Sequence, residues 1–231
     1  MKYRLRRSPD VQCDFCSEFA GGHNNQFSKR YRGLLESRIL HSTNHLRVFP
    51  TLGQLTEGHL LIAPLFHSES FSILSAEALD EAERLVASFR RELTASYGAS
   101  VIAFEHGIRS IEAGGCGISH AHMHVLPYTD DGGITAALSA QFKLQGISRL
   151  HDIEATLPAG YSYLFYENNQ AQRFVCHVKS IPSQFMRKLT ADHMLNPHWD
   201  WRERQVEQSL LETVGRFQPN LLIKTQQTVG V

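Results

Sequence analysis

The chain has 231 residues, of which 42% are hydrophobic, enough to bury the core of one large domain or of a core domain with an extension. Lysine plus arginine and aspartate plus glutamate both number 23, so the formal net charge is zero and provides no overall attraction to nucleic acid or membranes. No apolar run of signal-peptide length follows the basic residues 1–7, and no stretch is apolar enough to span a membrane. We therefore expect a cytoplasmic protein with neither nucleic-acid nor membrane partners.

Cys13 and Cys16 form a Cys-x-x-Cys pair near the start of the sequence. In a chain without a secretory signal, such a pair indicates a metal site or redox chemistry before a structural disulfide. No strand-to-helix thioredoxin pattern surrounds the pair, which makes redox chemistry the weaker choice. Two reduced cysteines in a local turn are the simpler alternative.

The next segments predict strands and one long helix. Residues 45–50 and 58–64 have the pattern of two strands joined by a turn around Gly53, which predicts a hairpin. Over 75–97, apolar residues recur at helical spacing, acidic residues occupy the first turns, and a glycine is placed to end the helix. The apolar stripe predicts that this helix packs on the core. Residues 101–104 are predicted to form another strand.

Three histidines, His120, His122 and His124, alternate with apolar residues in a predicted strand over 120–128. Successive side chains of a strand point to opposite faces, so three imidazoles would line one surface. Each buried imidazole needs a hydrogen-bond partner, so three together favour a functional cluster over ordinary core packing. Such a cluster can bind a metal, as in hydrolytic zinc sites, or act directly on a substrate.

A loop at 129–133 predicts a boundary between a catalytic domain, 1–130, and a C-terminal extension, 131–231. The extension contains a predicted helix near 134–144, a hairpin of 161–166 with 173–178, and helices within 182–194 and 203–217. The order of elements predicts an α+β fold with a mostly antiparallel sheet, one long packing helix, and an α/β extension packed on it. We hypothesise that the extension covers the active site of its own chain or of a partner subunit.

Four sequence blocks together resemble the histidine-triad (HIT) superfamily of nucleotidyl hydrolases and transferases. The superfamily signature is His-x-His-x-His followed by two apolar residues, with every x apolar, as in 120–126 here. The other blocks are Cys13-Asp14-Phe15-Cys16, residues 58–67, and Glu105-His106-Gly107. The resemblance covers about residues 10–130 and implies a HIT-like fold and a homodimer.

The resemblance implies a hydrolase that cleaves a nucleoside phosphate linkage at the α-phosphorus and releases a nucleoside monophosphate. His122 would be the nucleophile and would form a nucleotidyl-histidine intermediate. His124 would contact the phosphate and assist the leaving group, and His120 completes the catalytic triad. The expected partner is therefore a small molecule that contains a nucleotide.

The family match also assigns substrate-binding positions: His59, Thr51, Glu105, Gly115 and Gly117. Relatives usually have Asp or Asn in place of Thr51 and Asn in place of Glu105, and Gln followed by Ser or Thr at 116–117, where this chain has Cys and Gly. We therefore expect that the nucleophilic chemistry is retained while substrate recognition differs.

The family also suggests a use for the cysteine pair. In HIT relatives and in the related galactose-1-phosphate uridylyltransferases, zinc is bound by such a pair and two histidines, which match His67 and His120 here. Two cysteines and two histidines complete a closed tetrahedral site with no open position for water. The resemblance therefore implies a structural zinc ion bound by Cys13, Cys16, His67 and His120.

Three alternatives to hydrolysis remain open. A transferase would pass the nucleotidyl group to an acceptor other than water, although His124 favours hydrolysis because dedicated transferases usually carry Gln at that position. A non-catalytic nucleotide-binding protein would keep the triad only as a ligand site. A metallohydrolase would use the three histidines as metal ligands and would form no covalent adduct on His122.

Overall fold

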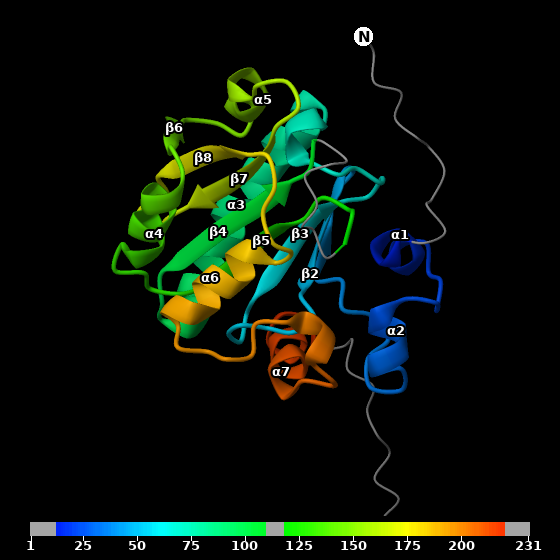
Figure 1. The fold of residues 1–231 in the computed structure, drawn as a ribbon. Coiled ribbons are helices and arrows are strands. Elements are labelled where there is room, and N and C mark those ends of the chain that lie inside the picture. The colour runs from blue at the N-terminus through cyan, green and yellow to red at the C-terminus, as the bar shows by residue number, and fades with distance from the viewer. Residues whose placement is uncertain (1–12, 110–117, 220–231) are drawn as a thin grey trace, which may run out of the picture.

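The computed structural model describes residues 13–109 and 118–219, and an eight-stranded antiparallel sheet lies at its centre (Figure 1). In spatial order the strands are β1 (His41–Ser42), β2 (Leu46–Pro50), β3 (Leu60–Pro64), β5 (Met123–Pro127), β4 (Val101–Gly107), β7 (Ser162–Glu167), β8 (Arg173–Val178) and β6 (Gln145–Ile147). Neighbouring strands are antiparallel throughout this order. The predicted α+β fold is confirmed.

The triad-bearing strand is shorter than predicted. β5 begins at Met123, so His124 lies in the strand while His120 and His122 lie in the extended segment that leads into it. The predicted alternation still holds, because Ala121, Met123 and Val125 all pack into the core on the opposite face. β3 and β4 flank β5 and place the triad in the middle of the sheet.

The predicted long helix is α3 (Ala76–Tyr97), and it covers one face of the sheet (Figure 1). The Ser75 side chain accepts a hydrogen bond from the N–H of Ala78 and so caps the first turn. Gly98 ends the helix in the left-handed conformation, at φ 65°. The apolar stripe of α3 joins the inward side chains of the sheet in the larger hydrophobic core.

The remaining helices surround the sheet: α1 (Asp14–Phe19), α2 (Gln26–Tyr31), η1 (Phe71–Ile73), α4 (Gly133–Gln141), α5 (Asp152–Thr156), α6 (Phe185–His193), η3 (Trp201–Glu203) and α7 (Gln208–Phe217). α4 and α6 form a second hydrophobic core on the face opposite α3. The sequence patterns predicted α4, α6 and α7 but missed α1, α2 and α5, which have only five or six residues each. So short a helix displays too few turns for its periodicity to be recognised.

The predicted hairpin of the extension is present as β7 and β8, and it continues the same sheet. β7 pairs directly with β4, with Phe104 opposite Tyr166 and Glu105 opposite Phe165. The division near residue 130 stays a prediction, but the sheet crosses it without a break.

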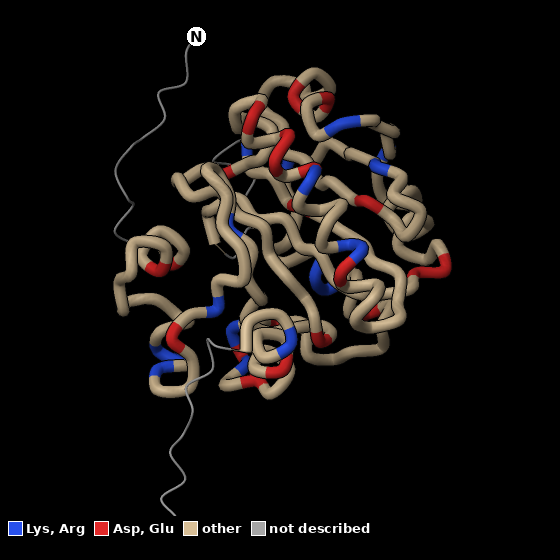
Figure 2. Tube along the Cα trace, turned by 180° about the vertical axis from the view of Figure 1, so that it is seen from behind, with Lys and Arg blue, Asp and Glu red and all other residues tan. Residues whose placement is uncertain are grey.

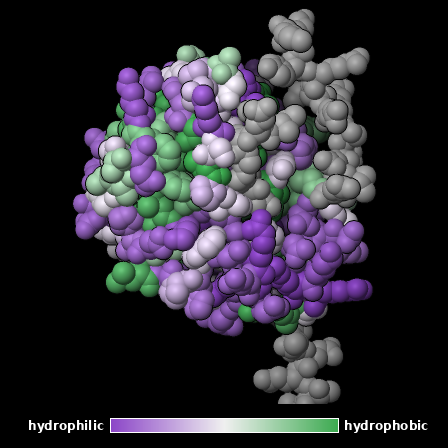
Figure 3. Space-filling model, viewed as in Figure 1, coloured by the Kyte–Doolittle hydropathy of each residue, from purple (hydrophilic) through white to green (hydrophobic). Residues whose placement is uncertain are grey.

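Charge and hydropathy vary over short distances along the described chain. Acidic and basic residues are interspersed along it (Figure 2), and the face that carries α6 mixes hydrophilic and hydrophobic residues (Figure 3). Within the described ranges, none of the helices combines the length and hydropathy that a membrane span requires.

Candidate active site and metal centre

The triad faces an open cavity, whose empty space of about 740 Å³ includes solvent at its mouth. Its wall includes parts of α1 and α2, Arg38, the segment after β2, part of β3, the β4–β5 pair with the triad, and the start of α6 with Trp201. His122 and His124 both line it, whereas His120 does not. Two of the three triad imidazoles therefore share one space with any bound ligand.

Hydrogen bonding fixes the tautomer of His122. Its Nδ1 lies 2.7 Å from the backbone oxygen of His120. A carbonyl oxygen can only accept, so Nδ1 carries the hydrogen, and in the neutral ring the lone pair is on Nε2. Burial is the main effect that lowers the pKa of His122 to about 4, so the ring is neutral at pH 7. His122 therefore has the tautomer and the protonation state that a nucleophile needs.

A chain of hydrogen bonds sets the tautomer of His124 as well. The N–H of Leu55 lies 3.3 Å from Nδ1 of His59, which must accept, so His59 carries its hydrogen on Nε2. That nitrogen lies 2.8 Å from Nδ1 of His124, which leaves the hydrogen of His124 on Nε2. Burial lowers the pKa of both rings well below the usual value. His124 is therefore a neutral N–H donor, not a cation.

Phe104 and His59 hold His124 in place from two sides. The Phe104 ring stacks on that of His124, with centroids 4.5 Å apart, and also lines the cavity. His59 is fully buried and is absent from the cavity wall. The structure therefore places His59 behind His124, which it contacts at 2.8 Å, and not in the cavity wall where its predicted contact with substrate would lie.

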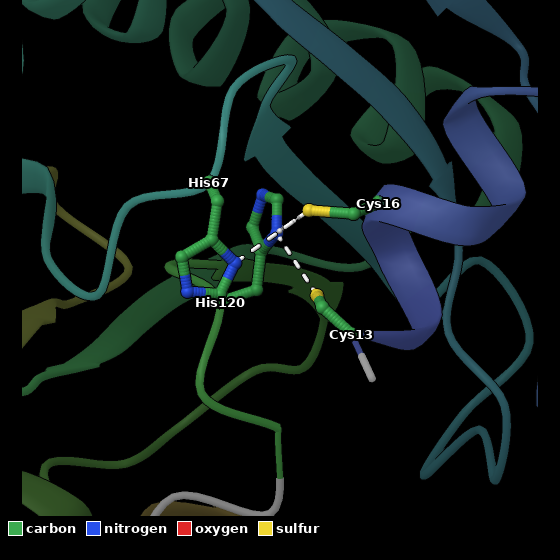
Figure 4. Close-up of side chains that lie close together, drawn as sticks. All are labelled: Cys13, Cys16, His67 and His120. Atoms are coloured by element: carbon green, nitrogen blue, oxygen red, sulfur yellow. Dashed lines mark hydrogen bonds between the residues drawn. The ribbon is translucent and has the colours of Figure 1, made fainter. Parts of the chain in front are cut away.

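Cys13, Cys16, His67 and His120 converge on one point (Figure 4). The cysteines lie at the start of α1, His67 follows β3, and His120 precedes β5, so three distant segments meet there. One ligand atom from each residue lies within 4.8 Å of all the others. The four residues that the family match assigned to zinc are therefore brought together, and we call them the Cys₂His₂ cluster.

The donor spacing in the Cys₂His₂ cluster fits tetrahedral zinc. The sulfur-to-Nδ1 distances are 3.4 Å for Cys13 to His120, 3.6 Å for Cys16 to His120, and 3.5 Å for Cys16 to His67. Zinc bond lengths predict about 3.6 Å between sulfur and nitrogen ligands. Burial opposes ionisation of Cys13, but hydrogen bonds to His120 and His67 lower the pKa of its thiol to about 5. A thiolate is the form that binds zinc.

His120 links the Cys₂His₂ cluster to the active site. Its Nε2 donates to the carbonyl of Pro64 at 2.9 Å, so Nδ1 presents its lone pair to the cluster. Its own carbonyl accepts from His122. Both ring nitrogens of His120 are thus engaged away from the cavity, and the geometry does not favour a metal bound by the three triad histidines.

The other predicted substrate-binding residues have different outcomes. Thr51 lines the cavity, as its predicted ribose contact requires. Glu105 does not, because it points to the opposite face of β4, where it accepts hydrogen bonds from the N–H of Phe71 at 2.9 Å and the hydroxyl of Tyr163 at 2.6 Å. The structure thus places Glu105 away from the cavity, contrary to the prediction that it contacts the substrate. Gly115 and Gly117, like Cys116, lie outside the described residues.

Several residues in the cavity wall were not predicted. His106, the neighbour of Glu105 in β4, lines the cavity, and its Nε2 is buried without a hydrogen-bond partner among the described residues. Arg38 is also in the wall, and it forms a two-pronged ion pair with Glu18 at 2.7 and 2.8 Å. His106 lies two positions after Phe104 on the same face of β4, so strand alternation is a signal that could have found it, whereas no local pattern marks Arg38.

The extension supplies a whole side of the cavity. Residues 184–187, at the start of α6, and Trp201 lie in its wall. The hypothesis that this region covers the active site stays a prediction, and the residues of the extension that line the cavity belong to the same chain as the triad. The Gln184 side chain donates to Asp200 at 2.8 Å, which connects the start of α6 to the segment carrying Trp201.

The chain is similar to a known family and to curated proteins over part of its length. A family model described as "Protein similar to CwfJ C-terminal" matches residues 41–142. The chain is 30% identical over 177 residues to CWF19-like protein 1 from Homo sapiens and from Mus musculus, and this region is 71% of this chain and 31% of those relatives. The chain therefore spans about a third of the length of the curated relatives it matches.

Solved structures of HIT proteins are among those to which the chain is similar. One is a HIT family protein from Bacillus anthracis, with 19% identity, 52% of this chain and 76% of that chain covered, and a TM-score of 0.41. Another is a zinc-bound histidine triad family protein from Mycobacterium smegmatis, with 14% identity, 52% and 78% covered, and a TM-score of 0.38.

Proposed function

We propose that this HIT-like chain hydrolyses a nucleoside phosphate linkage at the α-phosphorus, through a nucleotide bound covalently to His122. One observation carries the proposal: the hydrogen bond from Nδ1 of His122 to the carbonyl of His120, in a cavity that His124 also lines. That bond directs the lone pair of a neutral imidazole to Nε2, the nitrogen left to react with a ligand.

The two steps follow from the two tautomers. First, Nε2 of His122 attacks the α-phosphorus, a P–N bond forms, and the P–O bond to the leaving group breaks with its electron pair. The N–H of His124 stabilises the negative charge that develops on phosphate or leaving-group oxygens. Next, a water oxygen attacks phosphorus and releases a proton to solvent. The P–N bond then breaks, and its electrons return to Nε2.

The same proposal places a structural zinc ion in the Cys₂His₂ cluster. Its support is the donor set and the spacing, which match a closed tetrahedral site. When bound, the ion would hold the start of α1 against the segment that carries the triad. His120 would keep the orientation in which its carbonyl accepts from His122.

Quenched-flow mass spectrometry of the intact protein tests the covalent step. The protein is mixed with a panel of adenylyl and other nucleotidyl donors, with His122→Ala and His177→Ala in parallel. His177 lies in β8 near Thr156 and is absent from the cavity wall, so it controls for the loss of a histidine as such. We expect a transient nucleotide-sized adduct on the wild type and on His177→Ala, and about 10⁴-fold or greater loss of turnover in His122→Ala.

Other outcomes separate the alternatives. An adduct that passes to an added acceptor faster than to water would identify a transferase. Binding of a nucleotide without adduct or product, for every donor, would contradict the proposal and favour a binding protein. The homodimer and the cytoplasmic location stay predictions from the sequence.

A further inference from the structure

Arg187, in the first turn of α6, is held rigidly at the edge of the cavity by backbone carbonyls. Its Nε and Nη2 donate to the carbonyl of Trp199 at 3.1 and 3.0 Å, and Nη2 also donates to the carbonyl of Gly53. These bonds tie the β2–β3 loop to the segment before η3. The guanidinium therefore has little freedom to turn, and the direction of its remaining donor is fixed.

The third nitrogen of this guanidinium, Nη1, is buried and has no hydrogen-bond partner among the described residues. The whole side chain is almost completely buried, at 4% exposed, and it lines the same cavity as His122 and His124. An unpaired buried donor on a charged group costs free energy, and native proteins rarely keep one without a ligand or another use. The unpartnered Nη1 therefore makes Arg187 a candidate donor to a ligand in this cavity.

No carboxylate forms an ion pair with Arg187 within the described ranges. The nearest carboxylates that raise its pKa, Glu207 and Asp200, have other partners: Glu207 accepts from the N–H of Gly53 and from Arg204, and Asp200 accepts from Gln184 and Arg202. Burial lowers the pKa of Arg187 to about 10, so the side chain is still charged at pH 7.

Arg38 shows what a compensated arginine in the same cavity looks like. Two of its nitrogens bind both oxygens of Glu18, and the third donates to the carbonyl of Pro50 at 2.7 Å. Every nitrogen of that guanidinium has a partner, and the charge is neutralised inside the protein. Arg187 differs in both respects, because its charge has no ion-pair partner and its Nη1 has no hydrogen-bond partner among the described residues.

We propose that Arg187 is the phosphate-binding residue of this cavity, and that its Nη1 donates to an anionic oxygen of the nucleotide that His122 attacks. The identification of the anion as a nucleotide phosphate rests on the proposed function. The extension thus supplies part of the active site, because the guanidinium neutralises charge on the phosphate that the imidazole attacks.

Equilibrium binding tests this role without relying on turnover. Calorimetry measures the affinity of AMP, GMP, UMP and CMP, each beside its own nucleoside, for the wild type, Arg187→Gln and Lys188→Gln. Lys188 is the next residue of α6, is 54% exposed, and pairs with Asp192, so its variant removes the same charge from the solvent side. We expect Arg187→Gln to weaken monophosphate binding roughly 10- to 100-fold and to leave nucleoside binding unchanged. Lys188→Gln should change neither.

The monophosphate-to-nucleoside ratio separates phosphate binding from a purely structural role. Equal weakening of both ligands, or of neither, would overturn the proposal, as would a wild type that binds no monophosphate better than its nucleoside. If Arg187→Gln does not fold, Arg187→Lys takes its place; an unchanged ratio there also overturns the proposal, because a lysine cannot keep both carbonyls and reach the phosphate. If Arg187→Gln lowers the monophosphate-to-nucleoside ratio as expected but no adduct forms on His122 in the wild type, only the covalent step is refuted.

Discussion

Two parts of the cavity wall differ in how their polar side chains are paired. We call them the triad wall, which carries His122 and His124, and the α6 wall, which is formed by residues 184–187 and Trp201. On the triad wall, hydrogen bonds fix the tautomers of His122 and His124, and burial keeps both rings neutral. On the α6 wall, Arg187 keeps a full charge and an N–H without a partner. The proposed nucleophile needs its lone pair, and the proposed phosphate site needs a charge. The fold separates them by building the second wall from a later part of the chain.

The largest expected effect concerns the triad wall, which depends on the Cys₂His₂ cluster. We expect the wild type to contain one zinc ion per chain and Cys16→Ala to contain none. Without the ion, the cluster loses the bonds that hold α1 to His120, and structural zinc supplies on the order of 10 kcal/mol. That is as large as the whole stability of a typical domain, about 5–15 kcal/mol. Elemental analysis and chemical denaturation measure the two effects.

Cys176→Ala is the matched control for the zinc variant. Cys176 is equally buried but lies in β8, outside the cluster, and burial raises the pKa of its thiol to about 12. This variant should keep its zinc and lose about 1 kcal/mol of stability. Full zinc content and unchanged stability in Cys16→Ala would show that the cluster does not hold the metal.

The sequence predicted the triad wall far better than the α6 wall, and the reason is physical. The alternation of His120, His122 and His124 predicts both an extended chain and three imidazoles on one face. Local spacing was therefore sufficient to predict the triad wall. The spacing of 75–97 likewise predicted α3 almost to the residue. Arg187 has no such pattern. It is one of 23 basic residues, and only the three-dimensional structure shows that it is buried and lacks a partner.

Glu105 shows that a role assigned by matching a single position to a family motif can be wrong. The family match placed it in the substrate pocket, but the register of β4 sends Phe104 and His106 to the cavity and Glu105 behind the sheet. Its hydrogen-bond partner Tyr163 belongs to β7 and lies 58 positions later in the chain. No local pattern could show a contact over that separation.

A smaller effect is expected for Gly53→Ala, which acts on the α6 wall alone. Gly53 has φ +68°, and an added Cβ would lie 2.5 Å from the Cα of Trp201, which is backbone and must move. The left-handed conformation costs an alanine about 1–2 kcal/mol, and the collision adds about 1–3 kcal/mol. We expect a loss of about 2–5 kcal/mol in the free energy of unfolding and, because Arg187 is displaced, weaker AMP binding.

Gly33→Ala separates the two costs of that substitution. Gly33 has a similar φ, +82°, but an added Cβ there meets nothing within 4 Å. This control should show only the conformational cost and normal AMP binding. Equal effects of Gly33→Ala and Gly53→Ala on stability and on AMP affinity would mean that the contact with the Trp201 segment does not position Arg187.

The smallest expected effect concerns Glu105, where the sheet joins the two parts of the chain. Burial raises the pKa of Glu105 to about 7 from the value of 4.5 expected in the unfolded chain, although hydrogen bonds from Tyr163 and Phe71 oppose the shift. Tyr163 is the titratable group in contact with it among the described residues, and burial raises the pKa of that phenol well above 10, so it stays a neutral donor.

The sign of the pH dependence follows from proton binding. Between about pH 4.5 and pH 7 the folded state holds a proton that the unfolded state has released, so the free energy of unfolding falls as the pH rises through this window. Well above pH 7 the loss is complete and amounts to about 3 kcal/mol. In Glu105→Gln this component is absent, so the stability of the variant relative to the wild type should increase from pH 5 to pH 8. Denaturation at several pH values measures the difference, and a difference that does not vary with pH would show that Glu105 ionises with an ordinary pKa.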